Sequence, residues 1–120
     1  APMSSPNFEQ RPWGRFWVLS DAADCKVKRL EVEPGKRLSY QRHARRREHR
    51  MVVSGVAHVT LDDVEHRREV GETIDIPRGA WHRLANRGAE LLTVVEVQLG
   101  DYFGEDDIER KSDDFGRAGA

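Results

Sequence analysis

The chain has 120 residues, of which 34% are charged and 38% hydrophobic, and its formal net charge is −1 at pH 7. This length predicts one domain with a single core, and the balanced charge argues against nucleic acid or an anionic membrane as a partner. The single cysteine, Cys25, excludes an internal disulfide. We expect a cytoplasmic protein, because the sequence shows neither a signal peptide nor an apolar run approaching the roughly 20 residues of a membrane span.

The chain begins with a segment, residues 1–10, that is rich in Pro and Ser and lacks periodicity. We expect it to be a flexible lead-in, followed by one domain over residues 11–117 and a tail at 118–120. Aromatic and β-branched residues predict the first two strands at 15–19 and 26–32.

Short strands separated by Gly or Asp-Asp turns continue after an arginine-rich segment. They are predicted at residues 50–54, 57–62, 65–69, 73–76, 81–86 and 91–99. No convincing apolar stripe with a helical period precedes residue 100, so we predict an all-β sandwich or barrel of jelly-roll type. A short helix is expected only around residues 106–111.

Four side chains with metal-binding atoms fall in two segments. Gln41 and His43 share one face of an extended strand, Glu48 follows an arginine-rich turn, and His82 follows a Pro-x-Gly turn. One amide, one carboxylate and two imidazoles suit Zn²⁺, and also Mn²⁺, Fe²⁺, Co²⁺ or Ni²⁺. A buried polar network with Glu48 paired to an arginine fits equally well, and spacing alone does not choose. We expect the remaining histidines to be structural or solvated: His49, His58 and His66.

The two segments also resemble known motifs. Residues 35–55 resemble the first cupin motif, with Gln41 in place of its first His, and residues 71–86 match the second motif at every fixed position. A closer resemblance, to the type II mannose-6-phosphate isomerase (phosphomannose isomerase) domain, extends from about Arg11 to Arg117. It is carried by the stretches RPWGRFWVL, VKRLEVEPGKRLSYQ, EHRMVVSGVAHVT, IPRGAWHRLAN and EVQLGDYFGEDDIERKSDDFGR.

This resemblance implies a cupin jelly-roll barrel and a metal-dependent isomerase that interconverts mannose 6-phosphate and fructose 6-phosphate through a cis-enediol. It assigns one divalent metal ion, zinc before the other candidates, to Gln41, His43, Glu48 and His82. The family's domain is usually fused to a mannose-1-phosphate guanylyltransferase of GDP-mannose biosynthesis. The glycine-rich nucleotide loop of that enzyme is absent from this sequence, so we expect a stand-alone isomerase without guanylyltransferase activity.

The isomerase reaction needs a base on the inner face of the barrel. Lys28 is one candidate, because alternation puts it on the same face as Leu30 and Val32. Glu96, which shares its face with Gln98, is the other. The alternatives are that Lys28 extends to solvent and that Glu96 orients a ligand or pairs with an arginine.

The phosphate of the substrate needs cations. The family's histidine-rich stretch before Arg-Ala-Glu-His-Trp is altered here at residues 44–50, where its arginine is kept as Arg46 while the neighbouring histidines and the Trp are lost. The candidates are Arg46, Arg83, Arg110 and Arg117. Arg83 faces away from its neighbour His82 in a regular strand, and the arginines around Arg46 also fit a solvated cluster.

Two other functions use the same residues. A cupin oxygenase or epimerase would employ the same four ligands with iron or manganese, and a non-catalytic cupin would bind a sugar phosphate as a sensor or as a subunit of a separate guanylyltransferase. Fold-level analogy also predicts a homodimer. Its contact, or alternatively the core, would use the N-terminal aromatic residues Phe8, Trp13, Phe16 and Trp17.

Overall fold

The computed structural model describes residues 7–116, which form eleven strands and no helix. In chain order the strands are β1 (Phe8–Arg11), β2 (Gly14–Asp21), β3 (Cys25–Val32), β4 (Tyr40–Arg42), β5 (Arg46–Ser54), β6 (Ala57–Leu61), β7 (Val64–Arg68), β8 (Thr73–Ile76), β9 (His82–Ala85), β10 (Leu92–Gly100) and β11 (Glu109–Ser112). The predicted all-β class is confirmed. Within this part of the chain, no helix has the length and apolarity needed to cross a membrane.

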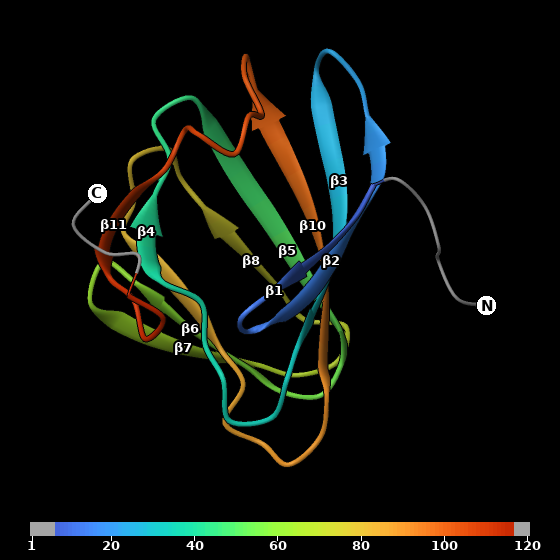
Figure 1. The fold of residues 1–120 in the computed structure, drawn as a ribbon, viewed down its shortest axis with the longest axis vertical. Coiled ribbons are helices and arrows are strands. Elements are labelled where there is room, and N and C mark those ends of the chain that lie inside the picture. The colour runs from blue at the N-terminus through green and yellow to red at the C-terminus, as the bar shows by residue number, and fades with distance from the viewer. Residues whose placement is uncertain (1–6, 117–120) are drawn as a thin grey trace.

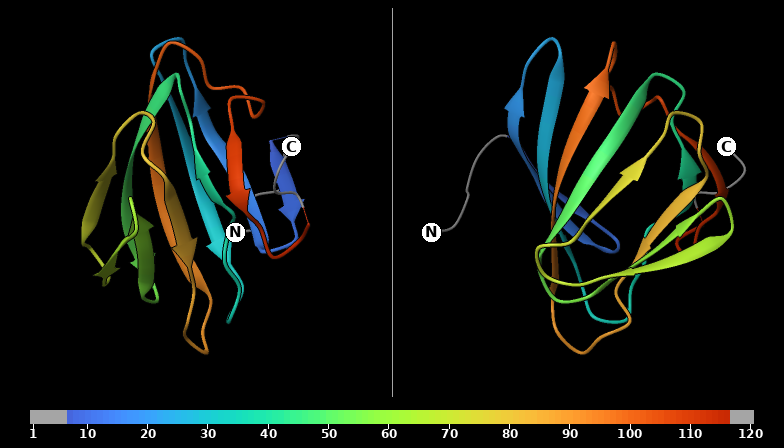
Figure 2. Two further views of the ribbon diagram at one scale, coloured as in Figure 1. Left: turned by 90° about the vertical axis from the view of Figure 1, so that its left-hand side faces the viewer. Right: turned by 180° about the vertical axis from the view of Figure 1, so that it is seen from behind.

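The strands form two antiparallel sheets that face one another (Figure 1). The larger sheet has the order β1-β2-β3-β10-β5-β8, and the smaller has the order β11-β4-β9-β6-β7. The two further views in Figure 2 show the sheets curving around a shared interior. This arrangement agrees with the predicted jelly roll, in which strands that are distant in sequence lie side by side.

The inward-facing side chains of the central strands change from apolar to polar along the length of each strand. On β10 the buried side chains run from Leu92 and Val94 to Glu96 and Gln98. The neighbouring strands change in the same direction, at Val32, Leu30 and Lys28 of β3 and at Val52, Arg50 and Glu48 of β5. The interior therefore has an apolar end and a polar end built from the same strands.

The apolar end is one contiguous cluster of buried side chains. It comprises Trp13, Phe16, Leu30, Val32, Leu38, Val52, Ala57, Val59, Ile74, Leu84, Leu92 and Val94. Both sheets contribute to it, so burying this cluster holds the sheets together. Trp13 and Phe16, two of the aromatic residues considered for a dimer contact, belong to this core.

Two local expectations were wrong. The helix expected around residues 106–111 does not form; Glu109–Ser112 is strand β11, which pairs with β4 and places Glu109 opposite Arg42. The unpaired edge of β4 offers backbone hydrogen bonds that override the weak local helix preference. Residues 8–10 of the expected lead-in form β1 together with Arg11, paired with β2. Residues 1–6 and the tail at 118–120 lie outside the described part.

Candidate metal centre and pocket

The four predicted metal ligands converge at the polar end of the interior. Gln41 on β4 lies opposite His82 on β9, and His43 follows β4 directly. Glu48 reaches the same region from β5 of the other sheet. All four side chains are buried. Strand pairing and alternation therefore bring together residues that are up to 41 positions apart in the sequence.

A turn of the second motif positions both histidines. Gly79 adopts a φ of 75°, a left-handed conformation that favours glycine, in the turn that leads to His82. Its backbone N–H donates to the carbonyl of His43 at 2.8 Å. The Pro-x-Gly signal seen in the sequence thus marks the contact that joins the two motifs.

The ligand atoms of His43, Glu48 and His82 lie within 4.8 Å of one another. Nε2 of His82 is 3.4 Å from Oε1 of Glu48, and Nε2 of His43 is 3.6 Å from Oε2. The two imidazole rings have centroids 5.2 Å apart. Two imidazoles and one carboxylate that converge in this way have the chemistry of a divalent metal site.

Hydrogen bonds on the far side of each ring determine which nitrogen faces the centre. Nδ1 of His43 is 2.7 Å from the carbonyl of Asp107, and Nδ1 of His82 is 3.0 Å from the carbonyl of Ala80. A carbonyl only accepts, so each Nδ1 carries a proton and each Nε2 faces Glu48. Nη2 of Arg46, a donor, lies 3.3 Å from Nε2 of His43, so this nitrogen is an acceptor. Nε2 of His82 is buried without a hydrogen-bond partner among the described residues. A cation would satisfy this buried acceptor, so the residues present fit a metal ion.

The protonation states favour the same conclusion. Burial lowers the pKa of His43, an effect that Glu48 opposes and Arg46 reinforces, so the imidazole is neutral at pH 7. Burial alone would raise the pKa of Glu48, but Arg50 and the two histidines hold it well below its usual value. A neutral imidazole and an ionised carboxylate are the forms that bind metal.

Glu48 is also the centre of an arginine network, the alternative left open by its spacing. Nε of Arg46 donates to Oε2 of Glu48 at 3.0 Å, and Nη2 of Arg50 donates to Oε1 at 3.0 Å. Burial alone would lower the pKa of Arg50, but Glu96 and Glu48 raise it. Each carboxylate oxygen has a second lone pair, so the network and a metal ion are compatible.

The two candidate bases are both held in ion pairs. Oε1 of Glu96 accepts from Arg50 and Oε2 accepts from Gln98, each at 2.8 Å. Both oxygens thus accept a hydrogen bond, as in the alternative in which Glu96 pairs with an arginine. Lys28 points inward as alternation predicts, and its Nζ lies 2.7 Å from Oε2 of Glu105.

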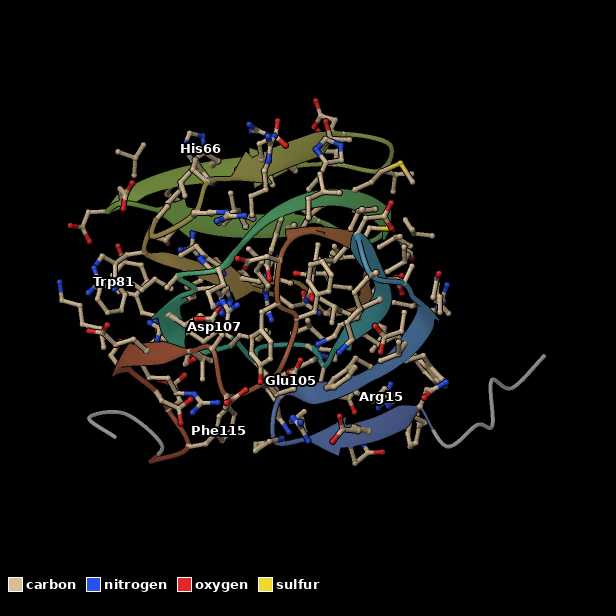
Figure 3. The ribbon with its side chains drawn as sticks, turned by 90° about the horizontal axis from the view of Figure 1, so that it is seen from above. Arg15, His66, Trp81, Glu105, Asp107 and Phe115 are labelled. Carbon is tan, nitrogen blue, oxygen red and sulfur yellow. The ribbon has the colours of Figure 1, made fainter. Side chains whose placement is uncertain are left out.

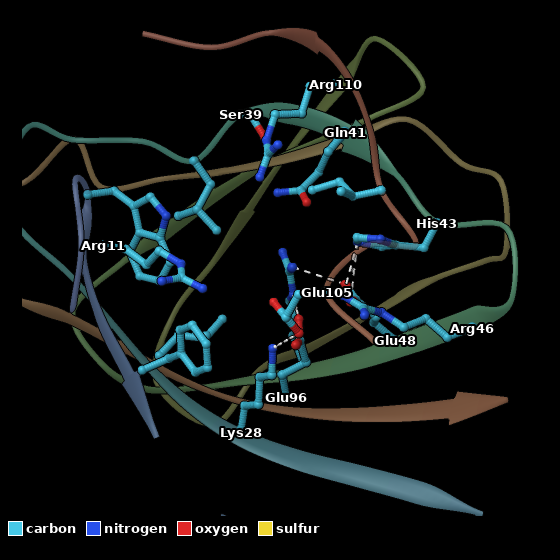
Figure 4. Close-up of a pocket in the computed structure, with 16 residues that line it drawn as sticks. Arg11, Lys28, Ser39, Gln41, His43, Arg46, Glu48, Glu96, Glu105 and Arg110 are labelled. Carbon is cyan, nitrogen blue, oxygen red and sulfur yellow. Dashed lines mark hydrogen bonds and ion pairs between the residues drawn. The ribbon is translucent and has the colours of Figure 1, made fainter. Parts of the chain in front are cut away.

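A pocket opens at this polar end and carries more positive than negative side chains (Figure 4). Three carboxylates line it, on Glu48, Glu96 and Glu105. Five cations line it, on Arg11, Lys28, Arg46, Arg50 and Arg110. The Nη1 atoms of Arg46 and Arg50 are buried with no partner in the described part of the chain. These donors and the positive excess suit an anionic ligand.

The four arginines predicted to bind phosphate have different positions. Arg46 and Arg110 line the pocket. Arg83 does not, because it alternates with the inward His82 and donates instead to the carbonyl of Leu38 at 2.8 Å. Arg117 lies outside the described residues.

Sequence reasoning missed several pocket residues. Arg50 had a usable signal, because it alternates with Glu48 and Val52 on β5. Arg11 had none, because residues 8–10 of its strand were assigned to the lead-in. Glu105 lies in a loop without periodicity, and only its pairing with Lys28 in space reveals it.

Known proteins resemble this chain in sequence. A family model for the "Mannose-6-phosphate isomerase C-terminal" region matches residues 5–113. The chain is 47% identical over 107 residues to the Alginate biosynthesis protein AlgA of Pseudomonas aeruginosa, covering 89% of this chain and 22% of that protein. It is 44% identical over 104 residues to a Mannose-1-phosphate guanylyltransferase of Sinorhizobium fredii, covering 87% and 20%. The chain thus spans about a fifth of the length of these curated relatives.

Solved structures with low sequence identity share the fold. A cupin domain of Cnp3 from Schizosaccharomyces pombe has a TM-score of 0.72 at 18% identity, covering 81% of this chain and 70% of that one. A protein from Klebsiella pneumoniae with a double-stranded β-helix domain has a TM-score of 0.71 at 18% identity, covering 92% and 84%. A cupin sugar phosphate isomerase from Silicibacter pomeroyi has a TM-score of 0.67 at 20% identity, covering 87% and 78%. These likenesses confirm the cupin jelly roll.

Proposed function

Because the chain belongs to the mannose-6-phosphate isomerase C-terminal family, we propose that it is a metal-dependent isomerase that interconverts mannose 6-phosphate and fructose 6-phosphate. One observation carries the proposal: two imidazoles and an ionised carboxylate converge beside a pocket whose cations outnumber its carboxylates. The first feature suits a divalent metal ion, and the second suits a sugar phosphate.

The metal ion, with zinc as the first candidate, would be held by Gln41, His43, Glu48 and His82. When bound, it supplies a Lewis acid that stabilises negative charge on the oxygens at C1 and C2 during proton transfer. The surrounding residues hold these ligands in place. Arg50 keeps Glu48 ionised and oriented, and is itself fixed by Glu96, which we therefore propose as a positioning residue.

The substrate phosphate would be bound by Arg46 and Arg110, with Arg117 as a further candidate from the sequence. Nη1 of Arg46 has no partner among residues 7–116, so it can donate to a phosphate oxygen without breaking its bond to Glu48. Arg110 lies opposite Gln41 in the pairing of β11 with β4, which sets it beside the metal ligands. Arg83 is not included, because it is bound on the outside of the barrel.

The name of one relative, a mannose-1-phosphate guanylyltransferase, supports our proposal that the reaction serves GDP-mannose biosynthesis. A cytoplasmic location is part of the proposal from the sequence. A homodimer remains part of the proposal. With Trp13 and Phe16 in the core, its aromatic contact would use Phe8 and Trp17, whose rings lie 5.1 Å apart.

The test is an assay of fructose 6-phosphate formation from mannose 6-phosphate by chelator-treated protein, before and after adding Zn²⁺, Mn²⁺, Co²⁺ or Fe²⁺ singly. We expect turnover only with metal, and none in His82→Ala. No turnover with any metal, despite one bound ion per chain, would contradict the isomerase proposal.

A non-catalytic sugar-phosphate-binding domain is the second candidate. Both oxygens of Glu48 accept hydrogen bonds from arginines, and these bonds would hold the carboxylate in a domain that binds its ligand without a metal ion. This candidate predicts that mannose 6-phosphate raises the melting temperature while no product appears. An oxygenase that uses the same ligands would instead consume oxygen.

A further inference from the structure

A loop at the polar end of the barrel brings an additional carboxylate into the pocket. Residues 101–108 connect β10 to β11, and Figure 3 shows Glu105 and Asp107 over the opening between the sheets when the barrel is seen from above. The carboxylate of Asp107 anchors the loop, because it accepts the backbone N–H groups of Ala44 and Arg45 at 3.0 and 2.9 Å. Glu105 lies only two residues from this anchor.

The shape of the loop is fixed by close contacts. The hydroxyl of Tyr102 donates to the carboxylate of Asp106, and a Cβ atom added at Gly104 would clash with both side chains. Gly104 thus lies in close contact with both side chains, between Phe103, whose side chain is buried, and Glu105. The loop presents Glu105 in a defined position.

The carboxylate of Glu105 is paired on one side and free on the other. Oε2 lies 2.7 Å from Nζ of Lys28 (Figure 4). The ammonium of Lys28 is also 4.3 Å from the ring centroid of Phe16. Oε1 has no hydrogen-bond partner in the described structure, and the side chain is 45% exposed while lining the pocket. Partial burial would raise the pKa of Glu105, but Lys28 lowers it, so the carboxylate is ionised at pH 7.

The other acid–base groups of the pocket are already engaged. Both oxygens of Glu48 accept from arginines, and both oxygens of Glu96 accept from Arg50 and Gln98. Glu105 is the one carboxylate lining this pocket that has an oxygen without a hydrogen bond among the described residues. A base must reach the proton that it removes, and this oxygen can turn toward a substrate without breaking a hydrogen bond.

We propose that Glu105 is the catalytic base of the isomerisation and that Lys28 is a positioning residue that holds its carboxylate. This inference rests on the proposed function and names the group that moves the proton.

The step balances with water as the only other proton carrier. A Glu105 oxygen takes the proton from C2 of open-chain mannose 6-phosphate as the C2–H bond breaks, and the electron pair of that bond forms the C1–C2 double bond while O1 takes up the carbonyl pair and a proton from water. The resulting cis-enediol returns the proton of O2 to water as the C2 carbonyl forms, and Glu105 gives its proton to C1. C1 is reduced, C2 is oxidised, and the base is regenerated.

The experiment compares Glu105→Gln with wild-type protein, both loaded with the activating metal ion. The matched control is Glu109→Gln, which makes the same change in the adjacent strand at an exposed side chain paired with Arg42 outside the pocket. The measurements are kcat and KM for mannose 6-phosphate, bound metal per chain, and deuterium incorporation at C1 of fructose 6-phosphate in D₂O by NMR.

For Glu105→Gln we expect kcat to fall by roughly 100-fold or more, with deuterium incorporation falling in parallel, as for the loss of a general base. KM should change less than about threefold, and bound metal should remain at the wild-type level. Formate added to Glu105→Ala should restore part of the rate, which a purely structural carboxylate would not show. Glu109→Gln should stay within about twofold of wild type.

Three outcomes would contradict the assignment. Wild-type turnover with kcat of Glu105→Gln within threefold overturns it and leaves the isomerase proposal standing. A raised KM with unchanged kcat makes Glu105 a binding residue only. No turnover by the metal-loaded wild-type protein overturns the proposed function and this inference with it.

Discussion

The two ends of the barrel interior use the same strands for different purposes. At the apolar end, Leu92 and Val94 on β10 pack in a cluster to which both sheets contribute. A few residues further along the same strand, Glu96 and Gln98 are equally buried but belong to a polar network. The first end gains stability from burial, whereas the second must satisfy each buried polar group with a partner.

This difference separates the fold from the function. The side chains of the apolar end could in principle be exchanged for other hydrophobic side chains that pack equally well. The polar end retains buried atoms without partners within residues 7–116, on His82, Arg46 and Arg50. Such atoms are costly unless a ligand meets them, so they indicate where the protein binds something.

The largest effect is expected from Glu48→Gln. It leaves Arg46 and Arg50 buried without their shared carboxylate, which costs roughly 3–5 kcal/mol of unfolding free energy, and it removes a proposed metal ligand. Urea unfolding and metal analysis by mass spectrometry measure both consequences. Glu109→Gln, at an exposed ion pair, is the control and should change stability by less than about 1 kcal/mol. An equally small loss in Glu48→Gln would contradict the account.

A change at the apolar end should affect stability alone. Leu92 is fully buried, so Leu92→Ala should lower the unfolding free energy by about 2–5 kcal/mol. Folded Leu92→Ala should still bind one metal ion and keep the wild-type KM. Loss of metal binding by the folded variant would show that the two ends are not independent.

A smaller effect is expected when an arginine inside the barrel and one on its outer surface are each replaced. Arg110→Gln should raise KM for mannose 6-phosphate roughly tenfold, because a charge-assisted hydrogen bond to phosphate is lost. Arg83→Gln removes an arginine that is bound on the outer surface, so steady-state kinetics should stay near wild type. Similar KM values for both variants would place the phosphate elsewhere.

The smallest effect concerns acid stability of the metal-free protein. Folding lowers the pKa of His43, chiefly through burial, and holds that of Glu48 well below its usual value. Both groups bind protons less readily in the folded than in the unfolded protein. Their contribution to the free energy of unfolding is therefore fully present above pH 6.5, the ordinary pKa of His43, and is lost as the pH falls toward their folded-state pKa values. Melting temperatures of chelator-treated protein should therefore decline from pH 7 to pH 5. In His43→Asn the melting temperature should fall less steeply just below pH 7. A curve identical to that of wild type would contradict the contribution of His43 to acid stability.

Alternation allowed much of the fold and part of the site to be predicted from the sequence. It correctly placed Lys28, Glu96 and Gln98 inside, because residues two apart on a strand share a face. It also put Arg83 and His82 on opposite faces. The convergence of Gln41 with His82 came from the motif resemblance, since strand pairing across 41 positions has no local signal.

Irregular segments could not be predicted in the same way. The acidic stretch before β11 has a helix-like composition, yet it forms the loop that carries Glu105 and then a strand on the free edge of β4. Both this loop and this strand depend on tertiary contacts, such as the hydrogen bond that the carboxylate of Asp107 accepts from the backbone of Ala44. Arg11 was missed for the same reason, because β1 exists only as a partner of β2.

X-ray absorption spectroscopy of zinc-loaded protein tests the central claim most directly, that the polar end of the barrel is a metal site. The account predicts one ion per chain with only nitrogen and oxygen neighbours at about 2.0–2.2 Å, a signal from two imidazoles, and loss of that signal in His82→Ala. A sulfur neighbour from Cys25 at about 2.3 Å, or the same spectrum in His82→Ala, would contradict it.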